Sequence, residues 1–177
     1  DFVSGMREGG LSVTLKTFPG IGNVSADVTE SIAENTDSLM TIRDTNFVPY
    51  ASGIQAGADC VMVSNAAYSK LTVKKVPAFM SQDIVTKLLR EELGFDGIVM
   101  TSPLNDNVIE NNYTNEFAVV EAVKAGCDLI VLPGNFKECY EALITAVEEG
   151  RIDEKVINTS VRRILQNKIQ RGILVLE

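Results

Sequence analysis

The chain has 177 residues, of which 45% are apolar and 23% are charged; its net charge is −8 and it contains no histidine. This size and composition are typical of a globular protein with a core of its own, and we expect one domain over residues 1–177. Scattered acids without a basic cluster exclude nucleic acid and anionic membranes as partners, and no apolar run reaches the roughly 20 residues of a membrane-spanning helix.

The first residues read as the end of a helix. Phe2 and Met6 lie one turn apart and Gly9-Gly10 follows, so the chain opens inside an element. We therefore expect that a segment is missing upstream of Asp1. No signal peptide is visible, and the cellular compartment stays unassigned.

Four apolar segments predict the strands of a parallel sheet. The first, residues 11–18, follows Gly9-Gly10. The other three each follow a Gly-x-Asp triplet, and they comprise residues 60–63, 97–100 and 129–132. Each of these triplets begins where a helical pattern ends, a position at which glycine takes the left-handed conformation. Short, uninterrupted apolar runs are typical of strands buried on both faces.

Apolar residues at helical spacing predict helices between and after these strands. The four patterns are centred on residues 84–89, 117–123, 140–147 and 161–165. Ser81 is the expected N-cap of the first helix and Asp153 of the last. Alternation of this kind predicts an α/β fold of parallel βα repeats with right-handed crossovers. Four strands are the second half of a TIM (β/α)8-type barrel, and an open four-stranded parallel sheet fits the same alternation.

The three cysteines are Cys60, Cys127 and Cys139. Cys60 and Cys127 lie near the start of an apolar run and Cys139 lies in a helical pattern, so we expect small, buried, unpaired thiols. Without histidine and without a Cys-x-x-Cys pair, no metal site is expected. No phosphate-binding loop or dinucleotide fingerprint is present, and no cofactor is expected.

Several motifs in the same order resemble one enzyme family. They are KTFPGIG at residues 16–22, VMVSNAAY at 61–68, LLREELGFDG at 88–97 and SVRRIL at 160–165. Together they resemble the barrel domain of glycoside hydrolase family 3, in its β-N-acetylhexosaminidase branch, whose first motif reads KHFPGHGD. The resemblance implies the second half of the barrel, with a site on the loops that follow the carboxyl ends of the strands.

The resemblance also implies where the catalytic groups would stand, and this chain has replaced them. The family nucleophile is an aspartate at the position of Ser102, and its acid/base is an Asp-His pair at the positions of Asp27 and Thr29. A serine hydroxyl without a neighbouring base stays protonated, and threonine cannot shuttle a proton near pH 7. No catalytic set is therefore intact.

A sugar-binding set is implied by the same motifs. Lys16 matches the substrate-binding lysine of the family, Thr17 and Asn65 stand at two histidine positions, and Asp27 is retained. We expect these residues to line a site for an N-acetylglucosamine-type sugar. The alternatives are structural: a buried Lys16 paired with an acid, and Asp27 as a capping carboxylate of the loop.

Replacement carboxylates are also present. Asp106 and Glu110 follow the third strand, and Glu30 follows Asp27. Because the separation of two carboxyl groups sets the mechanism of a glycosidase, a relocated pair is a candidate. The asparagines that surround these acids in residues 105–115 favour a solvated loop instead.

Three hypotheses follow. The first is a degenerate family 3 domain without hydrolase activity, with a carbohydrate-binding or assembly role. The second is an active glycosidase of the β-N-acetylhexosaminidase class that uses relocated carboxylates, among them Asp27 and Asp106. The third is an interaction fragment, in which a second copy or a separate N-terminal half completes the barrel, because a half barrel exposes strand edges and an apolar inner face.

Overall fold

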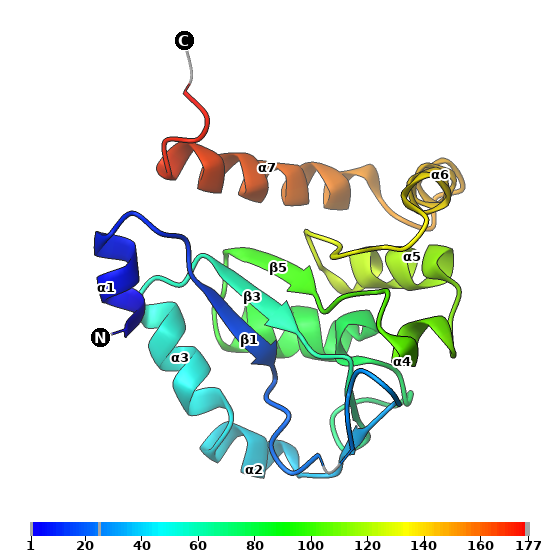
Figure 1. The fold of residues 1–177 in the computed structure, drawn as a ribbon, viewed down its shortest axis with the longest axis horizontal. Helices are drawn as coiled ribbons and strands as arrows, with labels where there is room; N and C mark the ends of the chain where they lie inside the picture. Colours follow the sequence, from blue (N-terminus) through cyan, green and yellow to red (C-terminus); the bar gives the residue numbers. More distant parts are fainter. Residues whose placement is uncertain (1, 25, 176–177) are drawn as a thin grey trace.

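A parallel three-stranded sheet forms the centre of the computed structural model, which describes residues 2–24 and 26–175 (Figure 1). The strands are β1 (Thr14–Phe18), β3 (Cys60–Val63) and β5 (Ile98–Thr101), in the order β1-β3-β5. Both pairings are parallel. The predicted α/β class with parallel βα repeats is confirmed.

The predicted fourth strand, residues 129–132, lies beside β5 as expected but does not form a continuous hydrogen-bonded ladder with it. Within residues 129–132, only Leu129 forms an isolated parallel bridge, with Met100 of β5. The N–H of Val131 donates to the Thr101 side chain, with 3.1 Å between Val131 N and Thr101 Oγ1, and Leu132 has a φ of 45°. Backbone bonds join Leu129 to Val99 and Thr101, but the Val131 N–H bonds to a side chain instead of a backbone carbonyl. The prediction of a full strand here is wrong because the regular ladder stops at this point.

Helices cover the outer face of the sheet and one end of it (Figure 1). The helices are α1 (Phe2–Glu8), α2 (Leu39–Asp44), α3 (Phe47–Gln55), the 3-10 helix η1 (Ala78–Met80), the π-helix η2 (Asp83–Glu92), α4 (Asn107–Glu110), α5 (Asn115–Ala125), α6 (Phe136–Glu148) and α7 (Glu154–Gln170). A small second sheet pairs β2 (Glu34–Asn35) with β4 (Ala67–Tyr68). The sequence patterns located neither α2 and α3 nor this second sheet.

Local signals place most helix ends. Asp153 caps α7, with its Oδ1 accepting the Lys155 N–H at 2.9 Å, as predicted. Gly126 ends α5 in the left-handed conformation with a φ of 110°, also as predicted. Ser81 is not the cap of η2: its backbone carbonyl accepts from Ile84, and the helix begins at Asp83 without a side-chain cap.

The core lies between the sheet and the surrounding helices. Val61, Val63 and Val99, on the outward face of the strands, are fully buried. The three cysteines are also buried and unpaired. This packing makes the outer face of the sheet the rigid support for the loops at its carboxyl end.

Helix α7 runs across the amino ends of the strands, opposite the arrowheads in Figure 1. Two buried carboxylates hold it there: Asp59 pairs with Arg171 of the segment after α7, and Asp128 pairs with Arg163 of α7. In barrel enzymes the amino end of the sheet serves stability, and the carboxyl end carries the active site.

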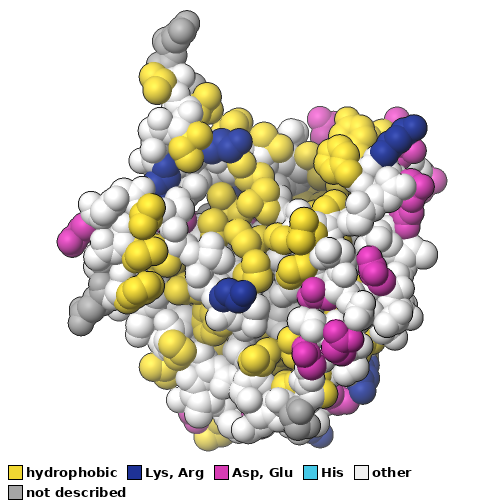
Figure 2. Space-filling model, in the orientation of Figure 1, with side chains coloured by type: hydrophobic (Ala, Val, Ile, Leu, Met, Phe, Trp, Pro, Cys, Tyr) yellow, Lys and Arg dark blue, Asp and Glu magenta, His cyan; other side chains and the backbone are white. Residues whose placement is uncertain are grey.

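The inward face of the sheet is open. The strand register puts Lys16 beside Met62 and Met62 beside Met100, and the bridge adds Leu129 to this row. Lys16 is exposed and the other three are only partly buried. Figure 2, which views this side, shows apolar side chains gathered over the middle of the face.

Candidate functional site

The carboxyl ends of the strands bring four loops to one side of the molecule. Backbone hydrogen bonds link neighbouring strand ends. The Ser64 N–H donates to the Phe18 carbonyl, and the Ser102 N–H donates to the Val63 carbonyl. The Val108 N–H donates to the Thr29 carbonyl at 2.8 Å, which ties the loop after β1 to the start of α4. Residues far apart in sequence therefore lie on one rim of the molecule, which the loops at the carboxyl ends of the strands form.

Asn65 and Asp106 are in direct contact at this rim. Asn65 Nδ2 donates to Asp106 Oδ2 at 2.8 Å, and Asn65 is only 1% exposed. Burial raises the pKa of the Asp106 carboxyl; the bond from Asn65 opposes this, and the nearby charges of Asp27 and Glu30 raise the pKa further. These carboxylates therefore lie close enough to act on one another.

Asp27 is held by its own loop. Its Oδ1 accepts the backbone N–H of Thr29 at 2.8 Å and the Thr29 hydroxyl at 2.7 Å. The backbone bond, followed by the hydroxyl bond, lowers the pKa of Asp27. Thr29, at the position of the family histidine, thus orients this carboxylate and keeps it ionised.

Ser102, at the position of the family nucleophile, has its hydroxyl occupied. Ser102 Oγ donates to the Val63 carbonyl at 2.9 Å, and the residue is 6% exposed. Its backbone N–H donates to the same carbonyl. A side chain used in this way closes the junction between β3 and β5.

Lys16 and Thr17 belong to a depression that neither Asn65 nor Asp106 lines. They line an open depression of about 550 Å³ together with Gly20, Asn46 and other residues of the loop after β1 and the start of α3. Among the described residues, no hydrogen bond or ion pair joins Lys16 or Thr17 to Asp27, Asn65 or Asp106. Direct contacts among the described residues therefore do not join the expected sugar-binding set into one cluster.

The polar stretch after β5 is more ordered than its composition predicts. Residues 107–110 form α4, with Val108 and Ile109 fully buried. The helix corrects the expectation of a loop, whereas the four asparagines of residues 105–112 are exposed, as that expectation implied. The Asn107 amide donates to Glu30 Oε2 at 2.8 Å, a contact that spans 77 positions and that no local pattern could have indicated.

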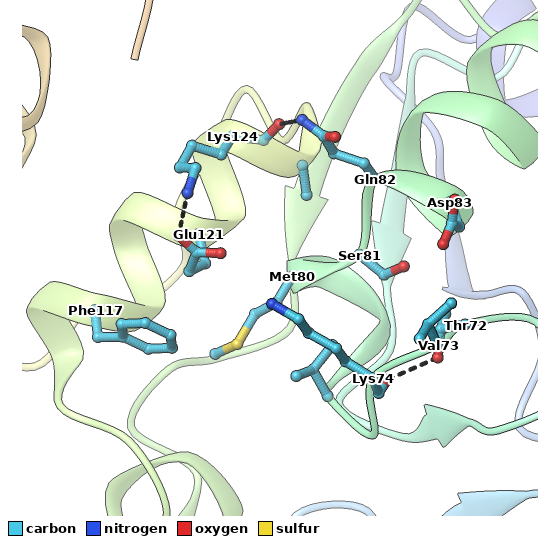
Figure 3. Close-up of a pocket in the computed structure, with 12 residues that line it drawn as sticks. Thr72, Val73, Lys74, Met80, Ser81, Gln82, Asp83, Phe117, Glu121 and Lys124 are labelled. Atoms are coloured by element: carbon cyan, nitrogen blue, oxygen red, sulfur yellow. Dashed lines mark hydrogen bonds and ion pairs between the residues drawn. The ribbon is translucent and has the colours of Figure 1, made fainter. Parts of the chain in front are cut away.

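A second cavity, of about 350 Å³, lies on the outer wall of the fold (Figure 3). Its polar groups already bond to one another: Lys124 pairs with Glu121, Gln82 donates to the Lys124 carbonyl, and the Thr72 hydroxyl donates to the Lys74 carbonyl. None of the predicted site residues lines this cavity. The rim at the carboxyl ends of the strands is therefore the stronger candidate site.

In the part of the chain that the structure describes, no group of three or more His, Cys, Asp or Glu residues is placed to hold a metal ion. Within the same residues, no helix is both long and apolar enough to cross a membrane.

Comparison with known proteins gives consistent matches. The model of the glycosyl hydrolase family 3 N-terminal domain matches residues 1–167. A β-hexosaminidase of Stenotrophomonas maltophilia (strain K279a) is 33% identical over 173 residues, which cover 98% of this chain and 48% of that protein. One from Xylella fastidiosa (strain M23) is 33% identical over 131 residues, covering 74% of this chain and 38% of that protein.

The structural match is equally close. A family 3 β-N-acetylglucosaminidase from Paenibacillus sp. str. FPU-7 superposes with a TM-score of 0.93 and 33% identity, over 99% of this chain and 35% of that one. The chain thus spans less than half the length of these relatives.

Proposed function

We propose that this chain, which belongs to glycosyl hydrolase family 3, binds an N-acetylglucosamine-type sugar at the carboxyl ends of its strands without hydrolysing it. The names of its relatives, β-hexosaminidase and β-N-acetylglucosaminidase, support the ligand class. The observation that carries the absence of hydrolysis is the bond from the Ser102 hydroxyl to the Val63 carbonyl.

A retaining glycosidase needs a carboxylate nucleophile on one face of the sugar and an acid/base on the other. Ser102 supplies neither a carboxylate nor a free hydroxyl, and the chain has no histidine to activate it. The Thr29 hydroxyl donates to Asp27, and threonine cannot carry a proton near pH 7. What remains at the rim is a set of hydrogen-bonding groups suited to sugar hydroxyls and amides.

The test has two parts, both on the 177-residue chain. In NMR titration with millimolar N-acetylglucosamine, we expect shifts centred on the amides of Asn65, Asp27 and Lys16. With an aryl N-acetyl-β-glucosaminide, we expect no release of the aryl group above the enzyme-free blank, in the wild type and in Ser102→Ala alike. Turnover above the blank would contradict the proposal, and loss of that turnover in Ser102→Ala would identify the serine as the nucleophile.

A second candidate function is an active glycosidase with relocated carboxylates. The observation that favours it is the raised pKa of Asp106 beside the lowered pKa of Asp27, since a pair of carboxyl groups with separated pKa values suits acid and base roles. It predicts turnover of the aryl glycoside that falls sharply in both Asp27→Ala and Asp106→Ala. Unchanged turnover in both variants would remove this candidate.

An assembly role is the third candidate, and the open inward face of the sheet favours it. Met62, Met100 and Leu129 are only partly buried there, and β1 lies at an edge of the strand order. A second copy or a separate half barrel would cover both features. Light scattering tests this: a dimer supports the role, whereas a monodisperse monomer that binds no hydrophobic dye counts against it.

A further inference from the structure

Three carboxylates and one buried amide converge on the loops after β1, β3 and β5. Asp27 and Glu30 lie on the first loop, Asn65 on the second, and Asp106 at the start of α4. The backbone bond from Val108 to Thr29 and the bond from Asn107 to Glu30 hold the first and third loops together. We call Asp27, Glu30, Asn65 and Asp106 the acidic rim.

The acidic rim has more acceptors than donors. One oxygen of each carboxylate is occupied: Asp106 Oδ2 by Asn65 Nδ2, Asp27 Oδ1 by Thr29, and Glu30 Oε2 by Asn107. The second oxygen of each carboxylate has no hydrogen bond from the described residues. Asn65 is only 1% exposed, and its Oδ1 is a buried acceptor without a hydrogen-bond partner among the described residues. A buried acceptor without a donor is unfavourable, and a ligand donor would relieve that cost.

The charges of the acidic rim are also uncompensated. None of the ion pairs among the described residues includes Asp27, Glu30 or Asp106. After burial, the charges that raise the pKa of Asp106 are the carboxylates of Asp27 and Glu30. Lys16 lines the neighbouring depression and contacts none of them through a hydrogen bond or ion pair. A cation placed among these carboxylates would relieve their mutual repulsion.

The geometry favours an ammonium group over a metal ion. A divalent metal needs several oxygens that converge within 2.0–2.6 Å of one point, and no group of three acids among the described residues is placed to do so. An ammonium group donates three hydrogen bonds at ordinary lengths and tolerates acceptors that are spread more widely.

Building on the sugar binding proposed above, we propose that the acidic rim selects a hexosamine whose 2-amino group is free and protonated over its N-acetylated form. The ammonium would donate to the unoccupied oxygen of Asp106 and to Asn65 Oδ1, with Asp27 and Glu30 adding long-range attraction. N-acetylation removes the charge and two of the three donors, so the acetylated sugar keeps one amide N–H donor and its hydroxyl contacts.

Calorimetric or NMR titration at pH 6 with glucosamine, N-acetylglucosamine and glucose tests this preference. We expect glucosamine to bind the wild-type chain about tenfold more tightly than N-acetylglucosamine, as one charge-assisted hydrogen bond implies. Raising the salt concentration to about 0.5 M should weaken glucosamine binding and leave the neutral sugars unaffected.

The decisive variant is Asp106→Asn, because its amide oxygen can still accept from Asn65 Nδ2 and keep the loop in place. It should lose about tenfold in affinity for glucosamine and keep its affinity for N-acetylglucosamine within about twofold. Asp83→Asn is the matched control, since it changes the net charge equally at a half-buried residue of η2 that pairs with Lys87. Circular dichroism checks that both variants are folded.

The outcomes separate the two proposals. If N-acetylglucosamine binds as tightly as glucosamine, or if Asp106→Asn behaves like Asp83→Asn, the preference for a free amine is overturned and sugar binding stands. If none of the three sugars binds at millimolar concentration, both proposals fail.

Discussion

Asp128 holds η2, the sheet and α7 together, and its substitution tests this account of stability most directly. Its side chain is 0% exposed; Oδ2 lies 2.6 Å from Arg90 Nη2 and accepts the Val99 N–H at 2.9 Å. Oδ1 lies 3.2 Å from Arg163 Nη1. We predict that Asp128→Asn lowers the free energy of unfolding by about 3 kcal/mol.

The magnitude follows from what the variant leaves behind. Burial lowers the pKa of the Arg90 guanidinium and Asp128 opposes that shift, so the variant keeps a buried cation without its carboxylate. Breaking a buried ion pair from one side costs roughly 3–5 kcal/mol. The lower end applies because asparagine can still accept from Val99 and because the Arg163 side chain is 23% exposed. For a chain of this size the loss corresponds to a fall of roughly 6–12 °C in Tm.

Urea unfolding followed by circular dichroism measures the change. Asp83→Asn is the control, because its pairing with Lys87 lies on the surface and should contribute nothing measurable. If Asp128→Asn stays within about 1 kcal/mol of the wild type, the buried network does not stabilise the fold and the reasoning is refuted.

Three further predictions concern single groups. Burial raises the pKa of Asp59, but the bonds from Arg171 and other donors outweigh burial, so the net pKa is lowered. The stability lost in Asp59→Asn should therefore be full above pH 3.8 and vanish as the pH falls below that value. Urea titrations across pH 2.5–7 would contradict this if the difference between variant and wild type grew in acid. A Cβ on Gly97 would lie 2.5 Å from the Asp59 carbonyl oxygen, so Gly97→Ala should cost about 1–3 kcal/mol in urea unfolding, and an unchanged midpoint would show that the backbone yields. Thr101→Val removes the acceptor of the Val131 N–H, so hydrogen exchange at that amide should accelerate; unchanged exchange would mean that another group protects it.

The strands show what can be predicted from the sequence. Uninterrupted apolar runs located β3 and β5 almost to the residue, because burial on both faces removes polar positions from a strand. The same signal at 129–132 overstated the strand, since an apolar run does not reveal whether a second neighbour will complete the ladder. Strand β1 begins at Thr14 and not at residue 11, because the residues before it form other backbone bonds. Leu11 bonds to Met6 of α1, and the Val13 carbonyl accepts from the segment after Gly57.

The candidate site was predictable in its members but not in its contacts. Asn65 and Asp27 were singled out from family motifs, and Asp106 as a replacement carboxylate after the third predicted strand, yet the pairing of Asn65 with Asp106 spans 41 positions. Lys16 matches the same family motif, but it lines a separate depression with Asn46. Motif matching names residue types at strand ends, whereas the loop conformations decide which of them meet.

The sequence by itself determined whatever depends on neighbouring residues. Asp153 begins α7 and Gly126 ends α5, because a side-chain cap and a left-handed glycine act within one helical turn. Only the tertiary structure decided that Asp59 pairs with Arg171, 112 positions away, and that Ser102 closes on Val63. Such contacts depend on the order in which strands and helices pack, and no local pattern of residues encodes that order.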